Sequence, residues 1–182
     1  MKPIVYMTVL AIFFLPAAAS AHVMFANAQA AAGTSYVGAL RVTHGCGGAA
    51  TTSLRVEIPE GVVGAKPQAK AGWTIQVEHA PLKTPVPGEG GKIQTTRVSA
   101  ITWTGNLPDD EFDDFSVQLK LPKATGAVYF PATQTCQTGR AEWKDIPAAG
   151  QAWHDVPHPA PVLTVTDAMA GMPGMDMGGM AH

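Results

Sequence analysis

Short stretches in which apolar and polar residues alternate recur along most of this chain. Residues 52–58 alternate cleanly through Leu54, Val56 and Ile58, and residues 115–121 alternate without a break until Pro122. A period of two places apolar side chains on one face of a strand, where they can face a core. No segment carries an apolar stripe of helical period over ten or more residues. The pattern therefore predicts antiparallel β-structure with one solvated face.

Five further segments show the same pattern less regularly, and glycine and proline residues separate them. They predict strands at residues 35–42, 73–78, 97–103, 127–131 and 141–146. Residues 84–91 are rich in proline and glycine, which predicts a hairpin tip or an insertion because these residues extend a strand ladder poorly. Short strands at this spacing predict an all-β fold, an immunoglobulin-like antiparallel β-sandwich.

The N-terminal 21 residues have the pattern of a secretory signal peptide. Lys2 precedes a short apolar stretch at residues 4–16, and Ala19-Ser20-Ala21 supplies the small residues that signal peptidase requires. We therefore expect residues 1–21 to be removed, which makes His22 the first residue of the mature protein. No later apolar run reaches the length of a membrane span. The expected location is the periplasm or the extracellular space.

The expected domain covers residues 22–147, followed by a flexible tail at residues 148–182. The tail begins rich in alanine, proline and histidine and ends rich in methionine. It lacks the branched apolar residues that offset the entropy of ordering, so we expect it to be disordered.

Charge and cysteine content narrow the functional classes. The formal net charge of −2 becomes −3 when Lys2 is lost, and the basic residues are scattered, which argues against nucleic acid as a partner. Cys46 and Cys136 are the two cysteines of the chain. A pair of cysteines in an exported protein predicts one disulfide, and a copper–thiolate pair is the alternative.

A histidine at a mature N-terminus is a chelating group in itself. The α-amine and the ring Nδ1 of His22 can bind one metal together, and a metal can displace both protons near neutral pH. Nitrogen ligands favour Cu(II) among the divalent ions. The alternative is that His22 merely happens to follow the cleavage site.

The end of the tail offers a different kind of ligand. It contains Met169, Met172, Met175, Met177 and Met180 and closes with His182. Thioether sulfur is a soft ligand that suits Cu(I). The segment predicts capture of Cu(I), and a low-complexity linker is the alternative.

Other candidate residues point less clearly to a metal. His44 lies beside Cys46 and could be a second ligand, although a loop histidine more often hydrogen-bonds a carbonyl group. His79, His154 and His158 are expected to be solvated, with a weak secondary metal site as the alternative. The tryptophans of the strand pattern, including Trp143, are expected in the core, and the acidic run at residues 109–114 in a solvated turn.

Several motifs in a fixed order resemble the YcnI-like family of exported copper-binding domains. They are Ala21-His22-Val23, residues 51–59, Gly72-Trp73-Thr74, residues 101–105, residues 107–115, residues 130–134 and Glu142-Trp143. The resemblance covers residues 22–147. It implies a β-sandwich in which one N-terminal histidine chelates Cu(II) beside a carboxylate and a tryptophan.

Carried over by position, the resemblance makes His22 the chelating residue and Trp143 the flanking tryptophan. Glu78 is the expected carboxylate, with Glu57 and Glu111 as rivals. The methionine-rich tail lies beyond the shared segment, and the cysteines are not part of the resemblance.

The sequence predicts a non-enzymatic protein for copper handling or delivery, with copper ions and another copper-trafficking protein as partners. A copper monooxygenase is a rival hypothesis, and it requires His44 or His79 to reach the metal beside His22. A CopC-like carrier, which also begins with a histidine on a sandwich, is a third hypothesis. A structural or adhesion domain that binds no metal is a fourth.

Overall fold

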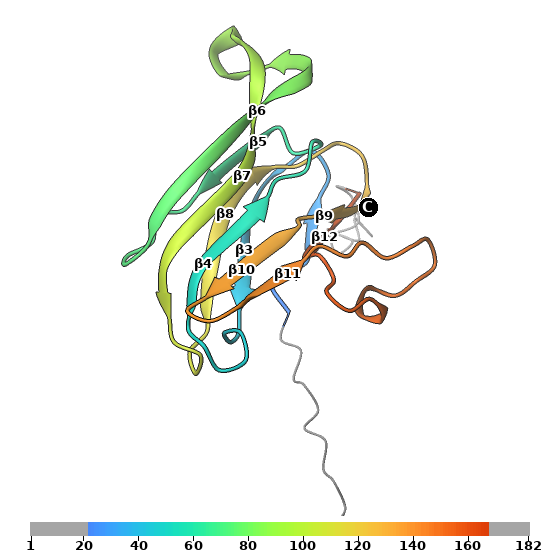
Figure 1. Cartoon of the computed structure of the whole chain (residues 1–182). Helices are drawn as coiled ribbons and strands as arrows, with labels where there is room; N and C mark the ends of the chain where they lie inside the picture. Colours follow the sequence, from blue (N-terminus) through green and yellow to red (C-terminus); the bar gives the residue numbers. More distant parts are fainter. Residues whose placement is uncertain (1–21, 168–182) are drawn as a thin grey trace, which may run out of the picture.

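A computed structural model of the chain describes residues 22–167, and within that range it contains strands and two short 3-10 turns but no α-helix. The predicted all-β fold is confirmed. Residues 22–167 include no helix long and apolar enough to cross a membrane. Figure 1 shows the strands stacked as layers of a sandwich.

Two sheets form the body of the sandwich. The first has the order β1 (Met24–Phe25), β3 (Ser35–Val42), β8 (Asp113–Lys120) and β5 (Gly64–Pro67). The second has the order β11 (Arg140–Trp143), β10 (Ala132–Cys136), β4 (Thr51–Glu57), β7 (Ile93–Leu107) and β6 (Thr74–Pro87). All neighbours in these two sheets are antiparallel. A third sheet joins β2 (Gln29–Ala31), β12 (Val162–Thr166) and β9 (Gly126–Tyr129).

The core lies between the two larger sheets, where their apolar faces meet. Trp103 of β7 and Phe115 of β8 are both fully buried, and their rings meet edge to face with centroids 5.5 Å apart. Leu54 and Val56 of β4 are buried on the same side. The alternation of apolar and polar residues that predicted these strands therefore reflects their position, because the apolar side chains face the core.

The hairpin of β6 and β7 extends beyond the rest of the sandwich (Figure 1). Its tip contains the turn η1 (Glu89–Gly91), within the proline- and glycine-rich segment at residues 84–91 that predicted a hairpin tip. β6 is an edge strand, which tolerates prolines because one of its sides needs no ladder partner.

The structure corrects the predicted start of the tail. Residues 148–167 are part of the fold: they include the turn η2 (Trp153–Asp155) and β12, which pairs with β2 in parallel and with β9 in antiparallel orientation. Leu163 and Val165 are buried, because residues 162–166 alternate apolar and polar in the manner of the other strands. The methionine-rich segment with Met169, Met172, Met175, Met177, Met180 and His182 lies outside the described residues.

Candidate metal centre

His22 lies between the rings of two tryptophans. Its ring centroid is 5.3 Å from that of Trp143 and 5.2 Å from that of Trp153. Val23 and Phe25 are buried beside it, and β1 pairs with β3 through Met24 and Phe25, so the start of the domain is fixed to the sandwich. The predicted chelating residue therefore lies between aromatic rings, in a segment that is held by strand pairing.

Trp143 is the last residue of β11 and belongs to the core cluster. Its backbone is held by antiparallel pairing with Ala132 of β10. The predicted neighbourhood of His22 and Trp143, which rested on the family resemblance alone, is thus present in the structure.

Trp153 comes from the segment whose composition predicts a flexible tail. Its indole Nε1 donates a hydrogen bond to the carbonyl oxygen of Ala160 at 2.7 Å. Asp145 joins the two ends of the segment: its carboxylate accepts from the backbone N–H of His158 at 2.9 Å, and its own N–H donates to the carbonyl oxygen of His158 at 2.9 Å. The segment at residues 145–160 is therefore a folded loop that closes over His22.

The same loop brings a second histidine to the site. The ring of His158 lies with its centroid 5.6 Å from that of Trp143. Trp153 was missed in the sequence, and His158 was expected to be solvated, because no strand pattern surrounds either residue. The signal that could have found them is the alternation at residues 162–166, which requires the chain to return to the sandwich after this loop.

His44 reaches the site from another part of the chain. Its carbonyl oxygen accepts a hydrogen bond from Nε2 of Gln134 at 2.7 Å, and Oε1 of Gln134 accepts from Nε1 of Trp143 at 3.4 Å. Gln134 is 3% exposed, so it forms a buried polar link between the His44 loop and the tryptophan beside His22.

The loop that carries His44 is fastened on its other side as well. Cys46 and Cys136 form the predicted disulfide. The backbone N–H of Gly45 donates to the carboxylate of Asp109 at 2.9 Å. These contacts join the loop to β10 and to the turn before β8.

The ring of His44 has one satisfied and one unsatisfied nitrogen. Nδ1 lies 2.7 Å from the carbonyl oxygen of Gly45, which can only accept, so Nδ1 carries the proton. Nε2 of the neutral ring then carries the lone pair, and it is buried without a hydrogen-bond partner among the described residues. The expected carbonyl hydrogen bond is present, and it leaves the second ring nitrogen available as a metal ligand.

Burial and charge both disfavour a protonated His22. Desolvation lowers the pKa of His22 below its usual value, and repulsion from His158 and then from His44 lowers the pKa further. A neutral imidazole is the form that binds metals, so fewer protons compete at this position. The rings of His158 and His44 therefore both act electrostatically on the ring of His22.

The donor set fits copper, but the groups of the folded domain do not by themselves form a finished site. Within residues 22–167, no three histidine, cysteine or acidic side chains are grouped closely enough to hold a metal ion. The nitrogen of His22 is still joined to Ala21 in the chain of 182 residues. Cleavage after Ala21 would convert this amide to an amine. The amine would add a nitrogen donor at the aromatic pocket, which is the space around His22 between the rings of Trp143 and Trp153.

The structure does not bring Glu78 to His22. β6 and β11 are opposite edges of the five-stranded sheet, about 19 Å apart at a strand spacing of about 4.8 Å. The carboxylate of Glu78 instead pairs with Arg55 at 3.0 Å. Val77, the residue before Glu78, lies in the cross-strand row of core residues that ends at Trp143. Adjacent residues of a strand point to opposite faces of the sheet, so the side chain of Glu78 points away from the core.

The rival residues also lie elsewhere. Glu57 pairs with Arg55 at 3.2 Å, on the same outer face as Glu78. Glu111 is exposed in the turn before β8, and His79 is exposed on β6. The acidic residue of that turn that does contact the His44 loop is Asp109.

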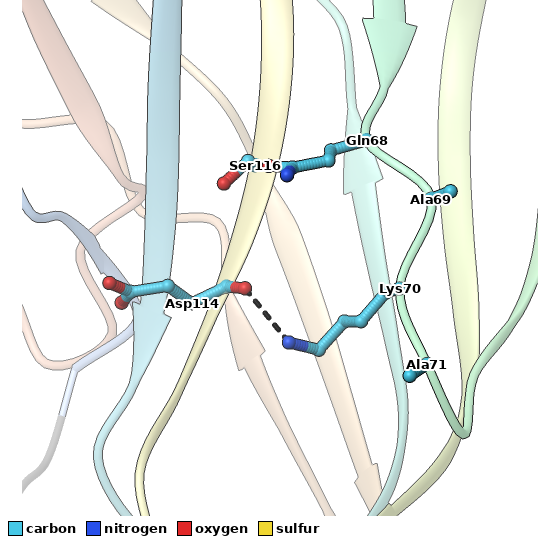
Figure 2. Close-up of a pocket in the computed structure, with 6 residues that line it drawn as sticks. All are labelled: Gln68, Ala69, Lys70, Ala71, Asp114 and Ser116. Carbon is cyan, nitrogen blue, oxygen red and sulfur yellow. Dashed lines mark hydrogen bonds between the residues drawn. The ribbon is translucent and has the colours of Figure 1, made fainter.

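A separate hollow of about 250 Å³ lies beside β5 and β8 (Figure 2). Lys70 points toward β8 there, donating to the carbonyl oxygen of Asp114 at 3.0 Å and pairing with the carboxylate of Asp113. Its charge is already compensated, and none of the site histidines lines this hollow.

Comparison with solved structures supports the fold. An uncharacterised protein from Nocardia farcinica, described as having an immunoglobulin-like fold, is 30% identical, with a TM-score of 0.58 over 79% of this chain and 97% of that one. The seventh ScaB type I cohesin from Pseudobacteroides cellulosolvens gives a TM-score of 0.38 at 11% identity, over 84% of this chain and 96% of that one, which is too low to carry an argument.

The first of these neighbours confirms the immunoglobulin-like architecture predicted from the strand pattern. No curated protein sequence matches the chain significantly. A family model matches residues 22–165, from His22 into the last strand, β12. The chain therefore belongs to the family described as a domain of unknown function, DUF1775, which is the YcnI-like family.

Proposed function

We propose that the processed protein is an exported copper-binding protein in which His22 holds Cu(II) through its α-amine and its ring Nδ1. The observation that carries this proposal is the position of His22 between Trp143 and Trp153. A chelating residue placed in an aromatic pocket, with a lowered pKa and two further imidazoles nearby, is suited to bind a metal and poorly explained as packing.

The surroundings of His22 support copper on chemical grounds. Among the divalent first-row metal ions, Cu(II) binds imidazole and amine nitrogen most tightly. The indole rings restrict water at the site and shelter a cation. The family match also begins at His22, the residue that the signal-peptide pattern makes the mature N-terminus. The Cys46–Cys136 disulfide is compatible with an oxidising, extracytoplasmic compartment.

The proposed role is binding and transfer, not catalysis. The tail from Met169 to His182 would capture Cu(I) through thioether sulfur, and another copper-trafficking protein would supply or receive the metal. In this scheme the domain stores the oxidised ion and the tail handles the reduced one.

The test uses the processed protein with a true N-terminal His22 and a control with one extra alanine before it. Cu(II) is titrated into both, and the electron paramagnetic resonance spectrum and the tryptophan fluorescence are recorded. We expect a 1:1 nitrogen-ligated signal with strong quenching, since two tryptophans contact His22, and we expect both effects to be lost in the control. Identical spectra from the two proteins would refute the proposal.

A copper monooxygenase is the second candidate, because the electrostatic effect of two other histidines on His22 favours it. It needs a second histidine near His22, and His44 and His158 both interact electrostatically with His22, whereas His79 lies on the distant strand β6. The test is hydrogen peroxide formation by the copper-loaded protein with ascorbate and oxygen. A rate no higher than that of the alanine-extended control would exclude this candidate.

A further inference from the structure

We propose that His44 supplies a further nitrogen ligand, through its Nε2, to the copper that His22 chelates. This inference rests on the proposed function and goes beyond it, because it changes the site from one histidine to two. It is carried by the buried Nε2 of His44, which has no hydrogen-bond partner within residues 22–167, and by the hydrogen bonds that connect His44 to the tryptophan beside His22.

The ring of His44 is oriented as the ring of a metal-binding histidine usually is. Metal-binding histidines usually donate their second ring N–H to a carbonyl or carboxylate oxygen, which fixes the tautomer and orients the ring. Nδ1 of His44 makes this bond to the carbonyl oxygen of Gly45, and the lone pair on Nε2 is left inside the protein. A buried polar atom without a partner destabilises the folded protein, and a bond to a metal would remove that cost.

The backbone around His44 is held from three directions. Gln134 binds its carbonyl oxygen, Asp109 binds the N–H of Gly45, and the disulfide of Cys46 follows directly. A ligand whose supporting groups are fixed loses little conformational freedom when the metal binds. Because Gln134 also binds Trp143, the same residue positions both His44 and one aromatic wall of the His22 pocket.

His158 is the rival second ligand, and the structure favours His44. The side chain of His158 is exposed at the edge of the loop, whereas Nε2 of His44 is buried. With His44, copper would have three nitrogen donors: the amine and Nδ1 of His22, and Nε2 of His44. With Glu78 on the far edge of the sheet, this nitrogen takes the place of the carboxylate that the family resemblance implies.

The experiment counts imidazoles on the copper. Pulsed electron paramagnetic resonance detects the remote nitrogen of each coordinated imidazole in the processed protein loaded with one equivalent of Cu(II). The variants are His44→Gln, His158→Gln as the test of the rival ligand, and His79→Gln as the matched histidine control. We expect two imidazoles in the wild type, in His79→Gln and in His158→Gln, one in His44→Gln, and a roughly tenfold weaker Cu(II) Kd in His44→Gln.

The outcomes separate this inference from the function on which it rests. One imidazole in both the wild type and His44→Gln would overturn the role of His44 and leave chelation by His22 intact. Loss of an imidazole in His158→Gln alone would overturn it in favour of His158. Failure of the wild type to bind Cu(II) would refute the proposed function itself. Circular dichroism and thermal unfolding of each metal-free variant confirm that the comparison is made between folded proteins.

Discussion

Replacing Gln134 with methionine removes the polar link between the His44 loop and Trp143 while keeping a side chain of similar length. Nε2 of Gln134 lies 2.7 Å from both the carbonyl oxygen of His44 and the hydroxyl of Thr51, and its Oε1 lies 3.4 Å from Nε1 of Trp143. All of these groups surround a side chain that is 3% exposed, so water cannot easily replace the amide.

The expected cost follows from the groups left without a partner. The Thr51 hydroxyl, which accepts from Gln134, keeps its contact with Sγ of Cys136 at 3.9 Å. The carbonyl oxygen of His44 and the N–H of Trp143 have no such second contact within the described part of the chain. At about 1–3 kcal/mol for each unsatisfied buried group, less about 1 kcal/mol for the additional apolar burial of methionine, Gln134→Met should lower the free energy of unfolding by about 3 kcal/mol.

Urea unfolding of the metal-free protein with its disulfide intact measures this change. With a slope of about 2 kcal/mol per molar urea, the midpoint should fall by about 1.5 M. Thr135→Val is the control, because Thr135 is the exposed neighbour on the same strand and should shift the free energy by at most about 0.5 kcal/mol. A loss below about 1 kcal/mol in Gln134→Met would show that the linked hydrogen bonds do not hold the His44 loop in place.

Three further predictions concern other contacts. Replacing both cysteines of the disulfide with alanine should lower the free energy of unfolding in urea by about 4–5 kcal/mol, because the bond closes a loop over a sequence separation of 90; a change below about 1 kcal/mol would contradict the chain-entropy argument. The hydrogen bond and charge of Arg41 lower the pKa of Asp114, so the loss of unfolding free energy in Asp114→Asn should be constant between about pH 5 and 7. This loss should disappear as the pH falls through the lowered pKa of Asp114. Urea unfolding of both proteins across this range measures it, and a loss that grows in acid would contradict the prediction. Trp153→Leu should raise the pKa of His22 in the metal-free protein toward its usual value, because burial is the largest cause of its depression; an NMR titration that finds a lower or unchanged pKa would count against this.

The longer strands of the two main sheets could be predicted because each has one face on the core. Residues 35–42 coincide with β3, and residues 115–121 overlap most of β8. Alternation fails for strands whose faces are not divided in this way. β10 was missed because its inward positions include the polar residue Gln134, whose burial depends on hydrogen bonds from distant parts of the chain.

The candidate site could be predicted only in part, for a related reason. His22 and the disulfide could be predicted because their signals are residue types that can be recognised without the fold: a signal-peptide pattern that ends at Ala21 and the two cysteines of the chain. The second aromatic wall, Trp153, depends on a loop whose return is fixed by hydrogen bonds around Asp145. Glu78 was chosen from its place on a strand, but strand order in a sheet is not readable from sequence alone, and the observed order puts it on the opposite edge.

In the proposed function, the arrangement of the site would link metal binding to export. In the precursor, the nitrogen of His22 belongs to the peptide bond with Ala21, and an amide nitrogen does not offer the lone pair that an amine does. The aromatic pocket, His44 and His158 are all supplied by the folded domain, whereas the amine would appear only after signal peptidase acts. Chelation by His22 would therefore begin outside the cytoplasm, where the Cys46–Cys136 disulfide can form and hold the His44 loop to β10. Processing and oxidation would each complete one side of the same site, so a protein that lacks either step should bind Cu(II) less tightly than the mature, oxidised form.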